Sequence, residues 1–114
     1  MKHAELNFRT GFRIATGNER SQAAVMVIAA GGREGGPDNR HKGADQWLYV
    51  TEGTGEAIIN NESVALSAGS IILIERGETH EIRNTGRSLL KTVNIFVPPA
   101  YTDDGDERPA GRSM

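Results

Sequence analysis

Two polar residues that could do chemistry, His80 and Asn84, stand four positions apart in a stretch whose alternation predicts a strand. Successive side chains of a strand point to opposite faces, so His80, Ile82 and Asn84 share one face. Glu81 and Arg83 share the other face, which we expect to lie against water because charged side chains are rarely buried unpaired. A polar group that faces the interior is costly to bury unless it is satisfied. We therefore expect the interior beside His80 to hold water, a metal ion or a ligand.

A second histidine, His41, precedes a short segment rich in aromatic and branched residues, which predicts another strand. Gln46 lies five residues after His41, across a turn. If Gln46 faces inward, Trp47 and Tyr49 face outward. Two large aromatic side chains on one outer face need cover from another segment or a second subunit, which motivates a homodimer hypothesis.

The composition sets limits on the class of protein. The chain has 114 residues and a net charge of -2, which fits one domain and argues against nucleic acid and membranes as partners. It contains no cysteine, so disulfides, thiolate metal sites and cysteine nucleophiles are excluded. The longest apolar run, residues 23–30, is far shorter than the roughly 20 residues of a membrane span. Without a signal-peptide pattern at the N-terminus, we expect a cytoplasmic protein.

Short strand-like segments separated by glycines organise the rest of the chain. The segment 31–43 is expected to be a long loop, and Asn60 and Asn61 a two-residue hairpin turn. No amphipathic helix of three turns is visible, so the pattern predicts an all-β sandwich or barrel. The barrel is expected over 1–99 and a flexible C-terminal tail over 100–114. The expected strands are 6–15 (an edge strand with a bulge), 22–30, 46–50, 56–59, 62–66, 71–74 (buried), the stretch around His80, and 89–97.

The stretch around His80 resembles the second sequence motif of the cupin superfamily, at residues 69–84. In that motif glycine, five residues, proline, any residue and glycine precede histidine by two residues and asparagine by six. Gly69, Gly77, His80 and Asn84 stand at these spacings, and Glu75 replaces the proline.

Residues 35–53 are similar to the first cupin motif, in a degraded form. His41 matches its second histidine, and Gly53 matches its glycine. Asn39 stands where the first histidine belongs, and Gln46 stands where the glutamate belongs. The chain is thus identified as a small single-domain cupin of the RmlC-like kind, which implies a jelly-roll (double-stranded β-helix) barrel without substantial helix.

The resemblance implies that His41, His80, Gln46 and Asn39 are ligands of a divalent metal inside the barrel. Iron, manganese, nickel, copper and zinc are not distinguished. Amide oxygens are neutral and weaker ligands than imidazole and carboxylate, so we expect weakened or altered metal binding. Asp45 could supply the missing carboxylate if the strand were shifted by one residue. We expect Asn84 to brace a neighbouring loop.

Three functions remain open for such a chain. The first is a barrel that binds a divalent metal and a small organic ligand, as an oxygenase or isomerase. The second is a metal-free, epimerase-like enzyme that uses His80 as a general base. The third is a binding module for a small molecule. The fold alone does not choose between them.

Overall fold

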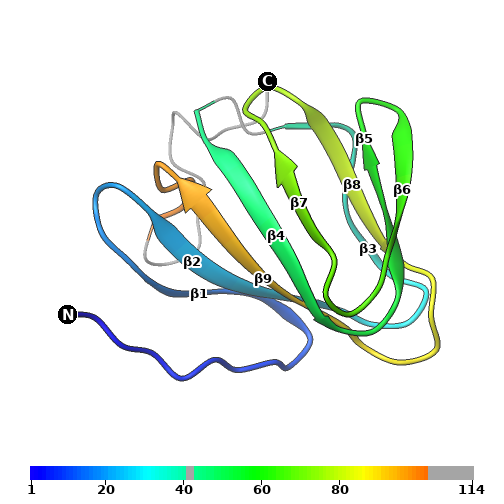
Figure 1. The fold of residues 1–114 in the computed structure, drawn as a ribbon, viewed down its shortest axis with the longest axis horizontal. Coiled ribbons are helices and arrows are strands. Elements are labelled where there is room, and N and C mark those ends of the chain that lie inside the picture. Colours follow the sequence, from blue (N-terminus) through cyan, green and yellow to red (C-terminus); the bar gives the residue numbers. More distant parts are fainter. Residues whose placement is uncertain (41–42, 103–114) are drawn as a thin grey trace.

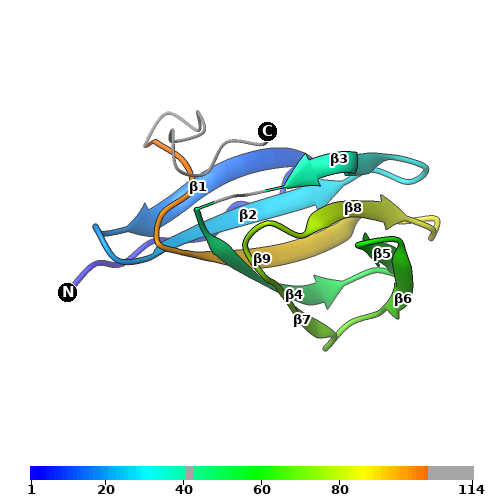
Figure 2. The ribbon, with the colours of Figure 1, turned by 90° about the horizontal axis from the view of Figure 1, so that it is seen from above.

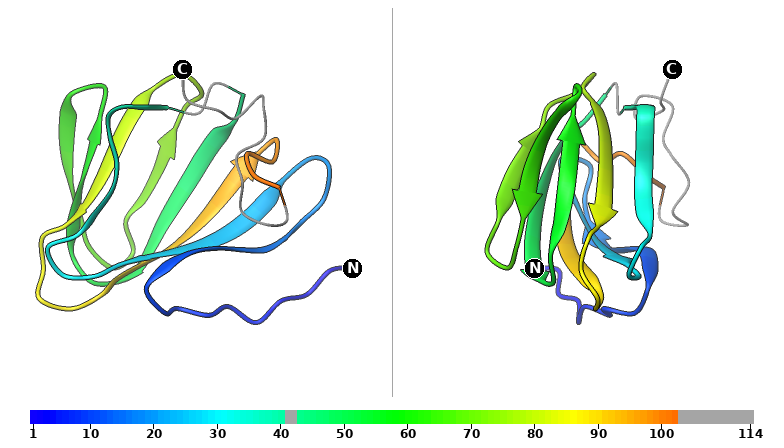
Figure 3. Two further views of the ribbon diagram at one scale, coloured as in Figure 1. Left: turned by 180° about the vertical axis from the view of Figure 1, so that it is seen from behind. Right: turned by 90° about the vertical axis from the view of Figure 1, so that its right-hand side faces the viewer.

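The computed structural model describes residues 1–40 and 43–102, with only the backbone described for 37–40. Every regular element in this part of the chain is a strand, and these residues contain no helix that could span a membrane. The first ten residues form an arm outside the sheets (Figure 3). The strands are β1 (Gly11–Gly17), β2 (Gln22–Ile28), β3 (Arg33–Arg40), β4 (Asp45–Glu52), β5 (Gly55–Ile59), β6 (Glu62–Leu66), β7 (Ile71–Ile74), β8 (Thr79–Asn84) and β9 (Leu90–Val97).

The strands form two antiparallel sheets that enclose the core (Figure 1). One sheet has the order β1-β2-β9-β4-β7 and the other the order β3-β8-β5-β6. Seen from above, β1 and β3 lie at one side of the molecule and β6 and β7 at the other (Figure 2). Two curved antiparallel sheets joined in this way are a jelly roll, so the predicted all-β fold class is confirmed.

The core between the sheets draws on alternate positions of both. Leu48 and Val50 of β4 face Ala57 and Ile82 of the other sheet's strands, all of them almost completely buried. A second cluster at one end combines Phe96 with small alanine side chains. Complete burial of a leucine, valine, isoleucine or phenylalanine side chain contributes roughly 1.5–3 kcal/mol to the stability of the fold.

The predicted hairpin between β5 and β6 is confirmed in detail. Asn60 and Asn61 have φ values of 49° and 69°, and the strands pair from Ile59 with Glu62 onward. Two successive positive φ angles match the twist of the flanking strands, and asparagine adopts them at low cost.

The long loop predicted over residues 31–43 is wrong, because β3 occupies most of it. Arg33, Glu34 and the glycines that follow pair with β8, and the register shifts before Arg40. Glycine and Pro37 give this segment a low strand propensity, which hid it. β3 is an edge strand, where a residue without an amide hydrogen is tolerated, and pairing with β8 decides its conformation.

Two further expectations differ from the structure in their burial. β7 is not buried throughout: Ile74 faces the core, but Ile71 is 60% exposed because β7 ends its sheet and has one open face. Glu81 lies on the outer face as predicted, yet it is only 3% exposed. Its carboxylate accepts hydrogen bonds from Arg33 Nη1 and Arg83 Nε, both at 3.2 Å, so the two arginines cover and neutralise it.

The packed part of the chain continues beyond residue 99. Ala100, which falls in the predicted tail, is completely buried. Tyr101 donates its backbone amide to Gln22 Oε1 at 3.1 Å and accepts a 2.9 Å bond from Gln22 Nε2 at its carbonyl. Residues 103–114 of the predicted tail lie outside the described residues.

Candidate functional site

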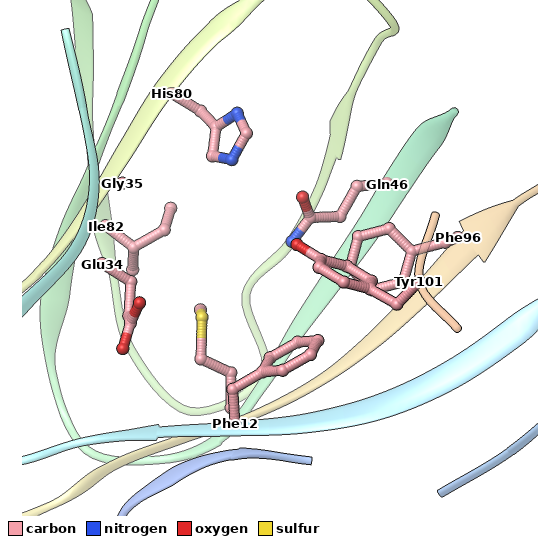
Figure 4. A pocket seen from close by; sticks show the side chains of 9 residues that line it. Phe12, Glu34, Gly35, Gln46, His80, Ile82, Phe96 and Tyr101 are labelled. Carbon is pink, nitrogen blue, oxygen red and sulfur yellow. The ribbon is translucent and has the colours of Figure 1, made fainter. Parts of the chain in front are cut away.

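A cavity of about 220 Å³ opens between the two sheets and brings together one set of polar and one set of aromatic side chains (Figure 4). Drug-sized ligands occupy pockets of roughly 300–1,000 Å³, so this cavity suits a smaller molecule. Its walls are Phe12, Met26, Glu34, Gly35, Gln46, His80, Ile82, Phe96 and Tyr101.

His80 enters the cavity from β8, in the middle of its sheet, and is 6% exposed. The strand is paired on both sides, with Ile59 opposite on β5 and Gly36 opposite on β3. Gly36 has no side chain, and a Cβ built there would meet nothing within 4 Å. The backbone around His80 is therefore fixed by two neighbours, while the space beside Gly36 stays open.

Gln46 enters the same cavity from β4, in the opposite sheet, and is 4% exposed. Its Nε2 donates to Asn94 Oδ1 at 2.9 Å. Asn94 Nδ2 donates to Thr92 Oγ1 at 3.0 Å, and Thr92 Oγ1 donates to the carbonyl oxygen of Met26 at 2.7 Å. Asn94 and Thr92 are fully buried on β9, beside Gln46, so the amide is held by a chain of buried hydrogen bonds.

The other end of the Gln46 amide lacks such support. Among the residues that the structure describes, no donor makes a hydrogen bond to Gln46 Oε1, although this atom is buried. A buried carbonyl oxygen without a donor costs roughly 1–3 kcal/mol. Such an atom in a cavity wall is suited to a metal ion or a ligand that donates a hydrogen bond.

Glu34 and the aromatic side chains are site residues that the sequence did not reveal. Glu34 lies on β3 opposite Ile82, on the same face as His80, and was assigned to a loop. The available signal was its position between Gly32 and Gly36 at every second residue, the spacing of one face of a strand. Phe12 and Tyr101 pack as tilted rings with their centroids 4.8 Å apart, and Phe96 meets Tyr101 edge-on at 5.1 Å.

Two of the predicted ligands cannot be placed. His41 lies outside the described residues, and of Asn39 only the backbone, in β3, is described. Within the described part of the chain no three histidine, cysteine, aspartate or glutamate side chains come together as a metal-binding group. His80 and Gln46 are thus the predicted residues that the structure brings to one cavity.

Asp45 does not take the place of the missing carboxylate. It precedes Gln46 on β4 and turns to the opposite side, where it accepts a 2.9 Å hydrogen bond from the backbone amide of Arg76. This bond, together with the nearby Arg76 guanidinium, lowers the pKa of the Asp45 carboxyl below its ordinary value. The one-residue shift that would bring Asp45 into the barrel is therefore contradicted.

Asn84 has the bracing role that the sequence suggested. Its Nδ2 donates to the carbonyl oxygens of Ile28 at 2.7 Å and Ser88 at 2.8 Å. Its Oδ1 accepts a bond from the amide of Gly86 at 2.9 Å. Asn84 joins β8 to the end of β2 and to the loop before β9, and it does not line the cavity.

Comparisons with known proteins agree with this architecture. The profile of the cupin domain matches residues 24–96. An oxalate-binding protein of Thermotoga maritima is 29% identical over 59 residues, which are 52% of this chain and 49% of that protein, so the match spans about half of each.

Two solved structures extend the comparison to nearly the whole fold. A protein of Bacillus halodurans is 27% identical, with a TM-score of 0.73 over 93% of this chain and 78% of the other. An RmlC-like cupin family protein with a double-stranded β-helix fold, from Methanocaldococcus jannaschii, has a TM-score of 0.74 over 86% and 91% at 14% identity. The second likeness concerns the fold alone.

Proposed function

The chain belongs to the cupin family, and on that premise we propose that it binds a divalent metal ion and a small organic ligand in the cavity between its sheets. The observation that supports this most is the buried Gln46 Oε1, which faces the cavity without a donor among the described residues. His80 supplies an imidazole from the opposite wall (Figure 4). Divalent transition-metal ions accept both an imidazole nitrogen and an amide oxygen as ligands.

The residues present fit such an ion in part. His80 and Gln46 would hold it, and His41 and Asn39 would complete the set that the family implies. Iron, manganese, nickel, copper and zinc all accept imidazole, and the donor set does not select among them. Since Gln46 carries no charge, the ion would keep more of its positive charge than with a glutamate ligand. When bound, it would act as a Lewis acid toward an oxygen atom of the ligand.

The ligand that fits is small and has two unlike ends. At one end His80, together with a metal ion held at Gln46, suits an oxygen-bearing head group, and at the other end Phe12 and Tyr101 offer apolar contact. A relative of this chain is named for binding oxalate, which makes a small carboxylate the first compound to test. An oxygenase and an isomerase both remain compatible with a ligand of this type.

Metal content tests the proposal directly. The protein is purified without chelator or metal-affinity resin, and metal is measured by inductively coupled plasma mass spectrometry. We expect near-stoichiometric metal that is lost in His80→Ala. The matched control is His3→Ala, because His3 is an exposed histidine of the N-terminal arm that pairs only with Glu5 among the described residues. Absence of metal after incubation with excess divalent ions would reject the metal part of the proposal.

A metal-free function is the second candidate, favoured by the neutral charge of Gln46 and the largely apolar wall. His80 would then act as a general base in an epimerase-like reaction, or would only contact a bound molecule. His80→Ala should abolish turnover without unfolding in the first case, and mainly change ligand affinity in the second. Binding of oxalate to metal-free protein, followed by calorimetry, separates both from the metal-dependent proposal.

The partner on the outside of the barrel is proposed to be a second copy of the chain. On the outer face, Trp47 lies opposite Leu73 and Tyr49 opposite Ile71, and all four are at least 39% exposed. We name these four residues the outer patch. An ion pair lies at each end of the β4 region, Asp45 with Arg76 at 3.4 Å and Lys91 with Glu52 at 3.3 Å. An apolar centre with a charged rim is typical of protein interfaces, and a two-fold dimer places the same patch on both sides.

A further inference from the structure

We infer that Thr92 and Asn94 are positioning residues that hold the carbonyl oxygen of Gln46 toward the cavity, so that this wall accepts a cation or a hydrogen-bond donor. The chain of bonds runs from Gln46 through Asn94 and Thr92 to the backbone of Met26. We name these residues the amide relay. Its direction follows from the chemistry of its members.

The relay is fixed at its far end by a group that can only accept. The carbonyl oxygen of Met26 has no hydrogen, so the Thr92 hydroxyl must donate to it over the 2.7 Å contact. A hydroxyl has a single hydrogen, so Thr92 Oγ1 is then an acceptor toward Asn94. Asn94 must turn its NH₂ group to Thr92, as the 3.0 Å bond shows.

The same reasoning carries the direction to the cavity. With its NH₂ group turned to Thr92, Asn94 presents Oδ1 to Gln46, and Gln46 must answer with its own NH₂ group. The Gln46 carbonyl oxygen is left to face the cavity, where the described residues offer no donor. Reversing the Gln46 amide would place its oxygen against Asn94 Oδ1, in a region where polar groups are costly to leave unpaired.

The relay therefore determines what the wall can recognise. An amide that could rotate would serve a donor or an acceptor equally, whereas this one offers only an acceptor. A metal ion, a hydroxyl or an ammonium group fits opposite the carbonyl oxygen of Gln46. An unprotonated carboxylate has only acceptor atoms, so it cannot form a hydrogen bond to this oxygen. Glu34, which lines the same cavity from β3, carries a carboxylate that likewise accepts hydrogen bonds or binds a cation.

The orientation can be tested without any metal. In ¹⁵N-labelled metal-free protein, the Gln46 side-chain amide protons should exchange slowly with water, because they are buried against Asn94. Thr92→Val removes the hydroxyl at nearly constant shape, and we expect the protection of the Gln46 protons to fall. Thr92→Ser restores a hydroxyl and should restore the protection. The matched control is Thr51→Val, which removes an exposed hydroxyl that donates to the carbonyl oxygen of Lys91 at 3.2 Å.

The consequence for binding rests on the proposed function and uses Co²⁺ as the probe. We expect Thr92→Val to weaken Co²⁺ binding by about tenfold to a hundredfold, the usual effect of removing a group that orients a metal ligand. Thr92→Ser and Thr51→Val should bind as the unchanged protein does. In a Gln46→Ala background, Thr92→Val should cause no further loss, since the relay acts only through Gln46.

The outcomes separate the two proposals. Rapid exchange of the Gln46 side-chain protons in the unchanged protein would overturn the inference, even if Thr92→Val did not fold. Protection that persists in folded Thr92→Val would overturn it as well. If the unchanged protein bound no Co²⁺ but showed protected protons that depend on Thr92, the metal proposal would fail and the orientation of Gln46 would stand.

Discussion

Each face of strand β4 departs from the usual distribution of polar and apolar residues, in a different way. The inner face carries Gln46, a polar side chain that is 4% exposed, beside the buried Leu48. The outer face carries Trp47 and Tyr49, two aromatic side chains that are each 43% exposed. Buried polar groups and exposed apolar patches are the informative departures from the normal pattern.

The difference between the faces indicates two kinds of partner. The inner face departs from the pattern at one residue, next to a cavity of about 220 Å³, which suits an ion and a small molecule. The outer face departs from it over the four exposed residues of the outer patch, which suits another protein. Positions that depart from the normal polar and apolar pattern are where functional sites are expected. Because neighbouring residues of β4 point to opposite faces, each face can be tested by substitutions that leave the other unchanged.

The largest effect should come from the part of β4 that follows the normal pattern. Leu48→Ala removes a side chain that is completely buried between the sheets, so the free energy of unfolding should fall by about 2–5 kcal/mol. Urea denaturation at low protein concentration measures it. Tyr49→Ala, the next residue on the outer face, is the control and should cost far less. Equal losses in the two variants would contradict the assignment of inner and outer faces.

Trp47→Glu should break the proposed homodimer. A buried tryptophan at an interface is worth about 2 kcal/mol or more, so the dissociation constant should rise by a factor of roughly 30 or more. Light scattering after size-exclusion chromatography measures the mass in solution. The control is Val64→Glu, an exposed apolar residue of β6 in the other sheet. A monomeric mass for the unchanged protein at high concentration would exclude the dimer.

Gln46→Glu should strengthen metal binding on the inner face by about tenfold, or roughly 1.4 kcal/mol, because it adds a negative charge beside the ion. The amide relay would have to reverse, since a carboxylate cannot donate to Asn94. Calorimetry with Co²⁺ measures the change. Gln22→Glu serves as the control, because Gln22 is equally buried but bonds Tyr101 and does not line the cavity. Unchanged affinity in Gln46→Glu would indicate that Gln46 is not a ligand.

The alternation of β4 and β8 made much of the fold and part of the site predictable from the sequence. In each strand a charged or aromatic residue follows an inward residue. For His80 this alternation predicted the inward direction, whereas for Gln46 it gave only a condition, that an inward amide places Trp47 and Tyr49 outside. The hairpin turn was predictable for a similar reason, because two successive asparagines adopt positive φ angles that most residues avoid. Local chemistry was decisive for His80 and for the hairpin.

The remainder depends on contacts between distant segments. β3 exists because β8 pairs with it, and its own glycines and Pro37 argue against a strand. Glu81 is buried because Arg33, 48 residues away, covers it. The amide relay joins Gln46 to Asn94 across the same separation, and no residue near Gln46 in the sequence predicts this hydrogen bond. Such pairings are set by the topology of the sheets.

The smallest effect concerns Asp45, the first residue of β4. The amide and guanidinium of Arg76 lower the pKa of Asp45 below its ordinary value of 3.8, so the folded protein binds this proton less readily than the unfolded chain. The stability that results is fully present above the ordinary value and is lost as the pH falls through the lowered one. Because the side chain is 35% exposed, solvent screens the interaction and it should amount to less than about 1 kcal/mol.

Asp45→Asn should therefore reduce stability slightly near neutral pH and match the unchanged protein at very low pH. Urea denaturation of both proteins across the acidic range measures the difference. Glu52→Gln is the control, because it removes an ion pair with Lys91 at the other end of β4 without removing a hydrogen bond to a backbone amide. A difference that grew as the pH fell would show that Asp45 is not stabilised in its charged form. The bond to Arg76 would then not be what holds Asp45 outside the barrel and Gln46 within it.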